Sequence, residues 1–178
     1  MAHLRRHPLI AAAAMIVAAA AFSLVTGCAE QTAPAEPASQ FQATVSGAIQ
    51  APLQGTAVVF ALPAAMVDST QVPASNILGM ADRDTKTVFA FKWQNTAALT
   101  PGDYVVGTDT SAVAMMYDAG TGAAGSTFSG SSGKVTITSA TDQLVSGTYS
   151  VTATADDTGA QITVTGTFTA PVKAGPID

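Results

Sequence analysis

The sequence predicts an all-β domain, either an antiparallel β-sandwich or a partly open barrel, preceded by a signal helix and a disordered tether. Three observations predict this fold. Apolar and polar residues alternate with a period of two over much of residues 41–173, which is the spacing of half-buried strands. No long segment shows helical periodicity. Proline, glycine and aspartate residues that favour turns separate the alternating segments.

The first 27 residues have the layout of a secretion signal. Arg5 and Arg6 precede an apolar run over residues 9–25, and the segment ends in Val25-Thr26-Gly27-Cys28. This ending resembles the lipobox of bacterial lipoproteins, in which a small residue precedes a cysteine that receives diacylglycerol before cleavage. The resemblance implies signal cleavage between Gly27 and Cys28, and a mature chain that carries palmitate or similar acyl chains on Cys28.

The acyl chains of such a lipoprotein hold it stably on a membrane that it does not cross. Ala29 follows Cys28, in place of the aspartate that favours inner-membrane retention in enterobacterial lipoproteins. The resemblance therefore implies a bacterial envelope protein on the outer membrane, with the membrane as its expected partner. The alternative is an uncleaved membrane helix. The apolar run is near the lower limit of about 17 residues for such a helix, and it is mostly alanine.

The residues after the signal exclude several mechanisms. Five of the seven Lys and Arg residues remain against all twelve Asp and Glu residues, a formal charge of −7, which disfavours nucleic acid as a partner. His3 and His7 lie in the signal, and Cys28 is the only cysteine. No Ser-His-Asp or Cys-His nucleophile and no zinc site of histidine and thiolate ligands can be built. We expect no enzyme activity, no cofactor and no metal site.

Residues 28–40 consist mainly of Ala, Pro, Glu, Gln, Thr and Ser and are expected to form a flexible, lipidated tether. The β-sandwich-like domain is expected over residues 41–173, with a C-terminal tail at 174–178. Residues 74–80, directly after Pro73, are expected to hold a short helix, and Pro52 and Gly55 to form the turn between the first two strands. Strands are expected at residues 41–49, 56–62, 87–93, 103–107 and 112–117, with three more within 134–170.

The turn between the last two strands predicts their register. Asp156-Asp157-Thr158-Gly159 is typical of a type I turn with its glycine in a left-handed conformation. Ala155 then lies opposite Ala160, Tyr149 opposite Gly166, and Gly147 opposite Phe168. Each aromatic ring is expected to cover the glycine that it faces.

Three segments of this region also resemble a known group of proteins. Gly-Lys-Val-Thr-Ile-Thr at 133–138, Val-Ser-Gly-Thr-Tyr-Ser at 145–150 and Val-Thr-Gly-Thr-Phe-Thr at 164–169, with Pro-Gly-Asp-Tyr-Val-Val at 101–106, are similar to the C-terminal half of small bacterial outer-membrane lipoproteins. The β-rich domain of these proteins has no known function. The resemblance implies the same antiparallel fold and transfers no catalytic residue.

Most of the carboxylates and lysines that could bind a ligand or take part in catalysis are expected to have structural roles instead. Carboxylates in turns could bind calcium, but their spacing does not fit an EF-hand, and turn aspartates bond to nearby backbone groups. A pair of carboxylates for glycoside hydrolysis would need a walled cleft. Lys92 alternates with the aromatic residues of 89–93 and is expected to point to solvent. The aspartates are Asp82, Asp84, Asp109, Asp118, Asp156 and Asp157, and the lysines are Lys86, Lys92, Lys134 and Lys173.

The segment 119–133 is rich in glycine, serine and alanine and is expected to be a loop. A loop of this length in a compact domain is either functional or disordered, and it lacks the pattern of a phosphate-binding loop. With Tyr117 just before it and Phe128 within it, this is the expected ligand or partner loop. The other aromatic residues either fill the core, which we favour, or line an apolar pocket: Phe89, Phe91, Trp93, Tyr104, Tyr149 and Phe168.

The expected function is that of a lipid-anchored envelope protein without enzyme activity, which acts through structural presence or protein contacts. The alternative is a carrier or sensor of a small apolar ligand held in a β-sandwich or barrel pocket.

Overall fold

The computed structural model describes residues 38–67, 70–94, 98–107, 113–122 and 125–175. The predicted signal, Gly27, Cys28 and most of the tether lie outside these residues, as does Asp109. The described part is all β, as predicted, and holds no helix that could cross a bilayer. Its strands are β1 (Gln40–Gly47), β2 (Ala51–Leu62), β3 (Ala65–Val67), β4 (Thr70–Val72), β5 (Ser75–Asp82), β6 (Val88–Gln94), β7 (Gly102–Val105), β8 (Val113–Asp118), β9 (Thr127–Ala140), β10 (Leu144–Ala155) and β11 (Gln161–Ala174).

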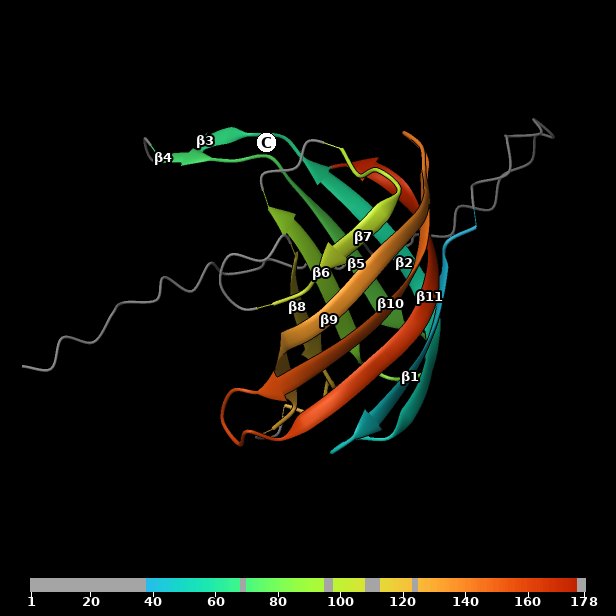
Figure 1. Cartoon of the computed structure of the whole chain (residues 1–178), viewed down its shortest axis with the longest axis vertical. Helices are drawn as coiled ribbons and strands as arrows, with labels where there is room; N and C mark the ends of the chain where they lie inside the picture. Colours follow the sequence, from blue (N-terminus) through green and yellow to red (C-terminus); the bar gives the residue numbers. More distant parts are fainter. Residues whose placement is uncertain (1–37, 68–69, 95–97, 108–112, 123–124, 176–178) are drawn as a thin grey trace, which may run out of the picture. The chain divides into compact units, whose positions relative to one another are not determined.

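Eight of these strands form a closed antiparallel barrel (Figure 1). Their order is β10-β11-β1-β2-β5-β6-β8-β9, and β9 closes the circle by pairing with β10. The predicted sandwich or partly open barrel is therefore corrected to a closed barrel. Closure depends on the 14 residues of β9, which pair with β10 along one edge and with β8 and then β7 along the other. The ribbon of β3 and β4 extends outward from β2 and β5.

The first strand lies between β2 and the last strand, β11. Strands β2 and β11 also pair directly with each other, in parallel, at the end of the barrel that β1 does not reach. The paired residues are Val59–Ala61 and Val172–Ala174. The Ser39 hydroxyl donates to the carbonyl oxygen of Ala57 at 2.6 Å and accepts from the Ala57 amide at 3.2 Å. The chain that precedes the barrel therefore joins it beside the middle of β2.

Aromatic rings fill the inside of the barrel. Phe89 is at their centre, with its ring centroid 5.3 Å from Phe41, 5.7 Å from Tyr149, 6.2 Å from Tyr117 and 6.3 Å from Phe91. The predicted face of β6 is confirmed, because Phe89, Phe91 and Trp93 are all buried. These rings pack against one another, as expected of a filled core. Tyr104, which was expected with them, is instead half-buried on β7, with its ring centroid 5.9 Å from that of Trp93. The buried rings are Phe41, Phe89, Phe91, Trp93, Tyr117, Phe128, Tyr149 and Phe168.

The predicted register of the last hairpin is confirmed. The Ala155 amide donates to the Ala160 carbonyl at 2.8 Å, and Gly159 has a φ of +70°. Tyr149 pairs with Gly166 and Gly147 with Phe168. A Cβ atom on Gly147 would lie 2.9 Å from the Phe168 ring, and one on Gly166 would lie 2.5 Å from the Tyr149 hydroxyl. Each glycine thus makes room for the ring that covers it.

Two local predictions are wrong. Pro52 and Gly55 lie within β2, opposite Thr44 and Phe41, and the chain turns before β2 begins. Gly55 is needed there because a Cβ atom would collide with the backbone carbonyl oxygen of Ala81 and lie 3.0 Å from the Phe41 ring. The predicted helix at 74–80 is strand β5, which pairs with β2 on one side and β6 on the other. These two neighbours bond the backbone of β5, and tertiary pairing outweighs the local helix signal.

Candidate functional site

One end of the barrel, the lower end in Figure 1, carries the loops β1–β2, β5–β6, β8–β9 and β10–β11. A pocket of about 500 Å³ opens between the first three of these loops. Its lining is mostly apolar, with several hydroxyl groups and one lysine among the lining residues. The apolar lining includes Ile49, Ala51, Pro52, Leu53, Tyr117 and Ala119, and the polar lining includes Thr85, Lys86, Thr87, Thr121 and Ser126. We call this pocket the mouth pocket.

Tyr117 lies at the inner end of the mouth pocket, with a relative exposure of 1%. Burial raises the pKa of its hydroxyl, and the charges of Asp82 and Asp118 raise it further, against the opposing effect of a hydrogen bond with the Thr87 side chain. The Thr87 hydroxyl also donates to the Ala119 carbonyl at 3.4 Å. Tyr117 is therefore a neutral hydroxyl in a short hydrogen-bonded chain. Such a group can orient a ligand and is a poor proton acceptor at neutral pH.

Phe128 is part of the core and not of a loop. It is fully buried on β9, and its ring packs edge-to-face on Tyr117, with centroids 5.8 Å apart and an interplanar angle of 76°. The expected loop at 119–133 is therefore wrong beyond residue 126, because β9 begins at Thr127. Gly130 of this strand leaves room for the side chains of Met115 and Val106. A Cβ atom on Gly130 would lie 2.8 Å from Met115 and 2.9 Å from Val106. Tyr117 borders the pocket, and Phe128 supports it from inside.

The aspartates of this end make the hydrogen bonds of turn residues. Asp82 accepts from the amides of Gln54, Asp84 and Thr85 and from the Thr85 hydroxyl, at 2.8–3.0 Å. Burial raises its pKa, but these hydrogen bonds outweigh that effect, so the pKa of Asp82 lies below its ordinary value. Asp82 is thus an ionised anchor of the β5–β6 loop.

Three other carboxylates make similar hydrogen bonds in or beside neighbouring loops. Asp118 accepts from the Gly120 amide and Asp157 from the Gly125 amide, both at 2.8 Å. Asp156 accepts from the Ser129 hydroxyl at 3.3 Å. Among the described residues, no group of three or more Asp, Glu, His or Cys could hold a metal ion.

A second hollow, of about 830 Å³, borders the mouth pocket and shares Pro52, Leu53 and Thr85 with it. Neutral polar residues of β1, β2 and β11 dominate its lining, among them Gln42, Thr44, Gln54, Thr165 and Thr167. Tyr149 also borders it, where the wall carries the small pair Ala43 and Gly166. No hydrogen-bond partner for the Tyr149 hydroxyl exists within the described part of the chain, and burial raises its pKa. No sequence pattern indicated this hollow.

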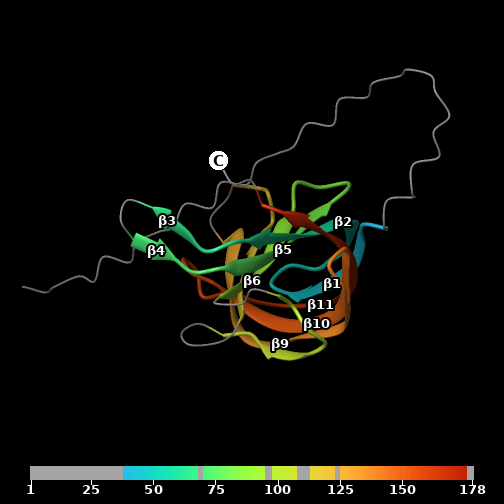
Figure 2. The same cartoon turned by 90° about the horizontal axis from the view of Figure 1, so that it is seen from above.

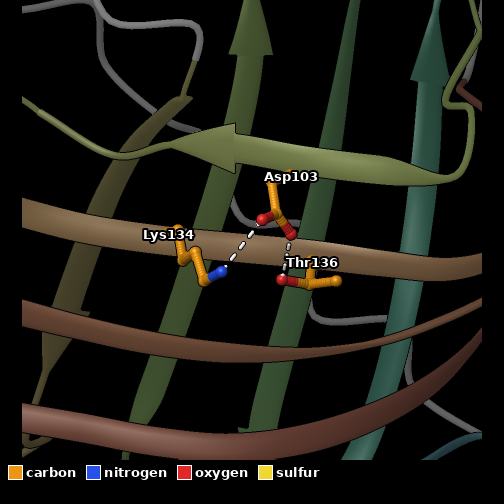
Figure 3. Close-up of polar contacts among 3 residues, drawn as sticks. All are labelled: Asp103, Lys134 and Thr136. Carbon is orange, nitrogen blue, oxygen red and sulfur yellow. Dashed lines mark hydrogen bonds and ion pairs between the residues drawn. The ribbon is translucent and has the colours of Figure 1, made fainter.

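The one ion pair among the described residues lies on the outer surface (Figure 3). The Lys134 amine is 2.9 Å from one carboxylate oxygen of Asp103, and the Thr136 hydroxyl donates to the other at 2.5 Å. The hydrogen bond from Thr136, followed by that from Lys134, lowers the pKa of Asp103. These contacts join β7 to β9 and occupy Lys134 away from either hollow. They are therefore structural.

Comparisons with known proteins find no relative of this chain. No family model matches it, and no curated protein or solved structure is similar to it. Its function is therefore inferred from its own residues and geometry.

Proposed function

We propose that this protein is a lipid-anchored, non-enzymatic component of the bacterial cell envelope. It is held on the outer membrane through Cys28 and acts through contacts that the barrel surface makes. The observation that carries the proposal is the filled interior, in which aromatic rings occupy the space that a carrier of the lipocalin kind would keep for its cargo. Contacts with partners are then made by the outer surface and the loops.

The chemistry of the surface hollows supports a binding role over catalysis. Histidine and cysteine are absent after Cys28. Asp82, the most strongly hydrogen-bonded carboxylate of the loop end, has a lowered pKa, whereas a general acid needs a raised one. The Tyr117 hydroxyl stays neutral because burial raises its pKa. Asp82 lines the second hollow, and the mouth pocket has no carboxylate among its described lining residues that could act as a general acid or base.

The lipid anchor is tested by the variant Cys28→Ala. It is expected to move the protein from the membrane to the soluble fraction, or to leave it as the unprocessed precursor, because no thiol remains to receive the lipid. Ala29→Ser, which keeps Cys28, is the matched control and should stay in the outer membrane. The measurement is fractionation together with the intact mass of the membrane-extracted protein. Normal outer-membrane fractionation of Cys28→Ala would refute the anchor.

The mouth pocket favours a second function, the binding of a small apolar ligand. Its volume of about 500 Å³ falls in the range of small-molecule sites, and its lining is mostly apolar. The neutral fluorophore N-phenyl-1-naphthylamine is expected to bind with one-to-one stoichiometry and to brighten. Ala51→Phe, which fills the pocket, should abolish this signal, whereas Thr148→Phe, on the outer face of β10, should keep it. Equal signals from both variants would refute a site in this pocket.

A further inference from the structure

The outward-facing residues of the barrel differ between two opposite walls. On β1, β9, β10 and β11 they are mostly Thr, Ser and Gln, whereas on β2, β5, β6 and β8 they are mostly apolar. The residues between them, such as Val59, Leu78 and Phe91, are buried inside the barrel. Figure 1 and Figure 2 show these two groups of strands on opposite sides. We call the second surface the apolar wall: Val58, Phe60, Ile77, Val88, Ala90 and Met116.

The strand register makes the apolar wall continuous. Phe60 pairs with Ile77 across β2 and β5, and Val58, Gly79, Ala90 and Met116 are successive partners across β2, β5, β6 and β8. Directly paired side chains on one face are neighbours. Phe60 is 36% exposed, and the other five residues of the apolar wall are half-buried. Strands that are apolar on both faces are typical of sheets that pack against another layer on both faces. We therefore expect a partner to cover the outer face of the apolar wall.

Two lysines flank the apolar wall. Lys173 pairs with Phe60, and Ile77 pairs with Lys92, which gives the row Lys173–Phe60–Ile77–Lys92 across four strands. Only five cations remain after Cys28, where the formal charge is −7, and two of them lie in this row. On β2, β5, β6 and β8, acidic residues appear only at the lower margin, where β5 ends at Asp82 and β8 at Asp118.

This charge pattern discriminates between possible covers. In a symmetric pair of copies the same patch faces itself, which would bring four lysines to one interface, with Asp118, paired with Val88 at the lower margin, as the carboxylate that β2, β5, β6 and β8 place beside the wall. An anionic bilayer surface accepts both parts of the row, because lysine amines attract phosphate groups and apolar side chains enter the acyl boundary. The tether, with the composition of residues 29–38, has too few apolar residues to cover the wall.

The tether joins the barrel beside β2, which is one of the strands of the apolar wall. Ser39 is bonded to Ala57 of β2, and Phe60 follows three residues later on the same strand, about 10 Å away. Ten residues separate Ser39 from Cys28 and span at most about 35 Å. On the opposite wall, β10 and β9 lie three and four strands away from β2 around the barrel.

We propose that the apolar wall is the membrane-facing surface of the domain and rests on anionic phospholipid headgroups. This proposal depends on the proposed anchor at Cys28. Phe60 lies at the acyl boundary, and Lys92 and Lys173 contact phosphates. The ribbon of β3 and β4 extends from the same wall and adds the exposed side chains of Met66 and Val72.

The experiment uses the full lipidated protein in vesicles of phosphatidylethanolamine and phosphatidylglycerol. Because Cys28 carries lipid, Phe60→Cys or Thr148→Cys supplies the single reactive thiol for an environment-sensitive nitrobenzoxadiazole label. Thr148 is exposed on β10, in the opposite wall. The label at position 60 is expected to shift to the blue and to be quenched by spin-labelled lipids several-fold more than the label at 148. Equal quenching would overturn the proposal.

Charge reversal tests the role of the lysines. Lys92→Glu with Lys173→Glu should reduce quenching at position 60 to the level seen at 148, whereas Lys86→Glu, at the mouth pocket, should not. If the protein floats with vesicles while label 60 stays in water, the anchor stands and the membrane-facing wall is refuted. If the protein does not float, both proposals fall. If label 60 is protected in native membranes but exposed in vesicles, a protein covers the wall and the lipid proposal is overturned.

Discussion

Replacing Phe89 with alanine is expected to lower the free energy of unfolding by about 3–5 kcal/mol, the range for truncation of a buried phenylalanine. Phe89 is 2% exposed and contacts the rings of Phe41, Phe91, Tyr117 and Tyr149. A cavity at this position would remove contacts from all four. Since small domains are stable by only about 5–15 kcal/mol, the variant should unfold at a much lower urea concentration.

Phe60→Ala is the matched control for this measurement. Phe60 lies on the outer face of β2 and is 36% exposed, so its truncation should change the stability of the free protein in solution by about 0.5 kcal/mol or less. Similar small losses for the two variants would contradict a ring-filled interior. The barrel would then have room for a ligand among its aromatic residues.

Gly147→Ala is expected to destabilise the domain by about 3 kcal/mol through overpacking. A Cβ atom at Gly147 would collide with the backbone carbonyl of Thr136 on β9 and lie 2.9 Å from the Phe168 ring on β11. A backbone carbonyl within a paired strand cannot move aside without breaking the ladder. Thermal unfolding followed by circular dichroism would measure the loss as a lower Tm.

The control for this prediction is Gly79→Ala, which makes the same change in strand β5. No atom outside its immediate chain neighbours lies within 4 Å of a Cβ built on Gly79. Alanine there restricts the unfolded chain and is expected to be neutral or to stabilise by up to about 1 kcal/mol. If the two variants have the same Tm, steric closeness at Gly147 is not what makes a glycine necessary there.

The parts of the fold that depend on local signals could be predicted from the sequence. Alternation identified the inward faces of β6, β9, β10 and β11, because a half-buried strand repeats with a period of two. The tight turn at Gly159 fixed the register of Tyr149 and Gly166, because a short hairpin leaves no freedom in pairing.

Strand β5 was missed because its two faces are both apolar. Ile77 on the outer face breaks the alternation that Leu78 and Met80 on the inner face would otherwise show. Closure was also missed, because alternation shows which side of a strand is buried and not which strand is its neighbour. The outward apolar residues that break the alternation of β5 belong to the apolar wall, the surface for which we propose a membrane contact.

The candidate site was predictable only at Tyr117. Its position before a glycine-rich segment indicated a surface near a loop, and the mouth pocket begins there. The remaining lining comes from residues 49–53 and 85–87, which are distant in sequence and meet only through barrel closure. Phe128 was wrongly assigned to a loop because composition does not distinguish a glycine that packs within a strand, such as Gly130, from a glycine in a flexible loop.

The position of β1 between β2 and β11 determines when the domain can fold. Its first strand has no partner on one side until the last strand has been made, so pairing spans nearly the whole domain. Such distant pairings form slowly. If the protein is secreted as proposed, the chain would stay unfolded during transport across the membrane until β11 (Gln161–Ala174) has been transported. The barrel would then form only after the whole domain has crossed the membrane. A chain truncated before Gln161 would leave β1 and β10 as open edges, which are sites of aggregation.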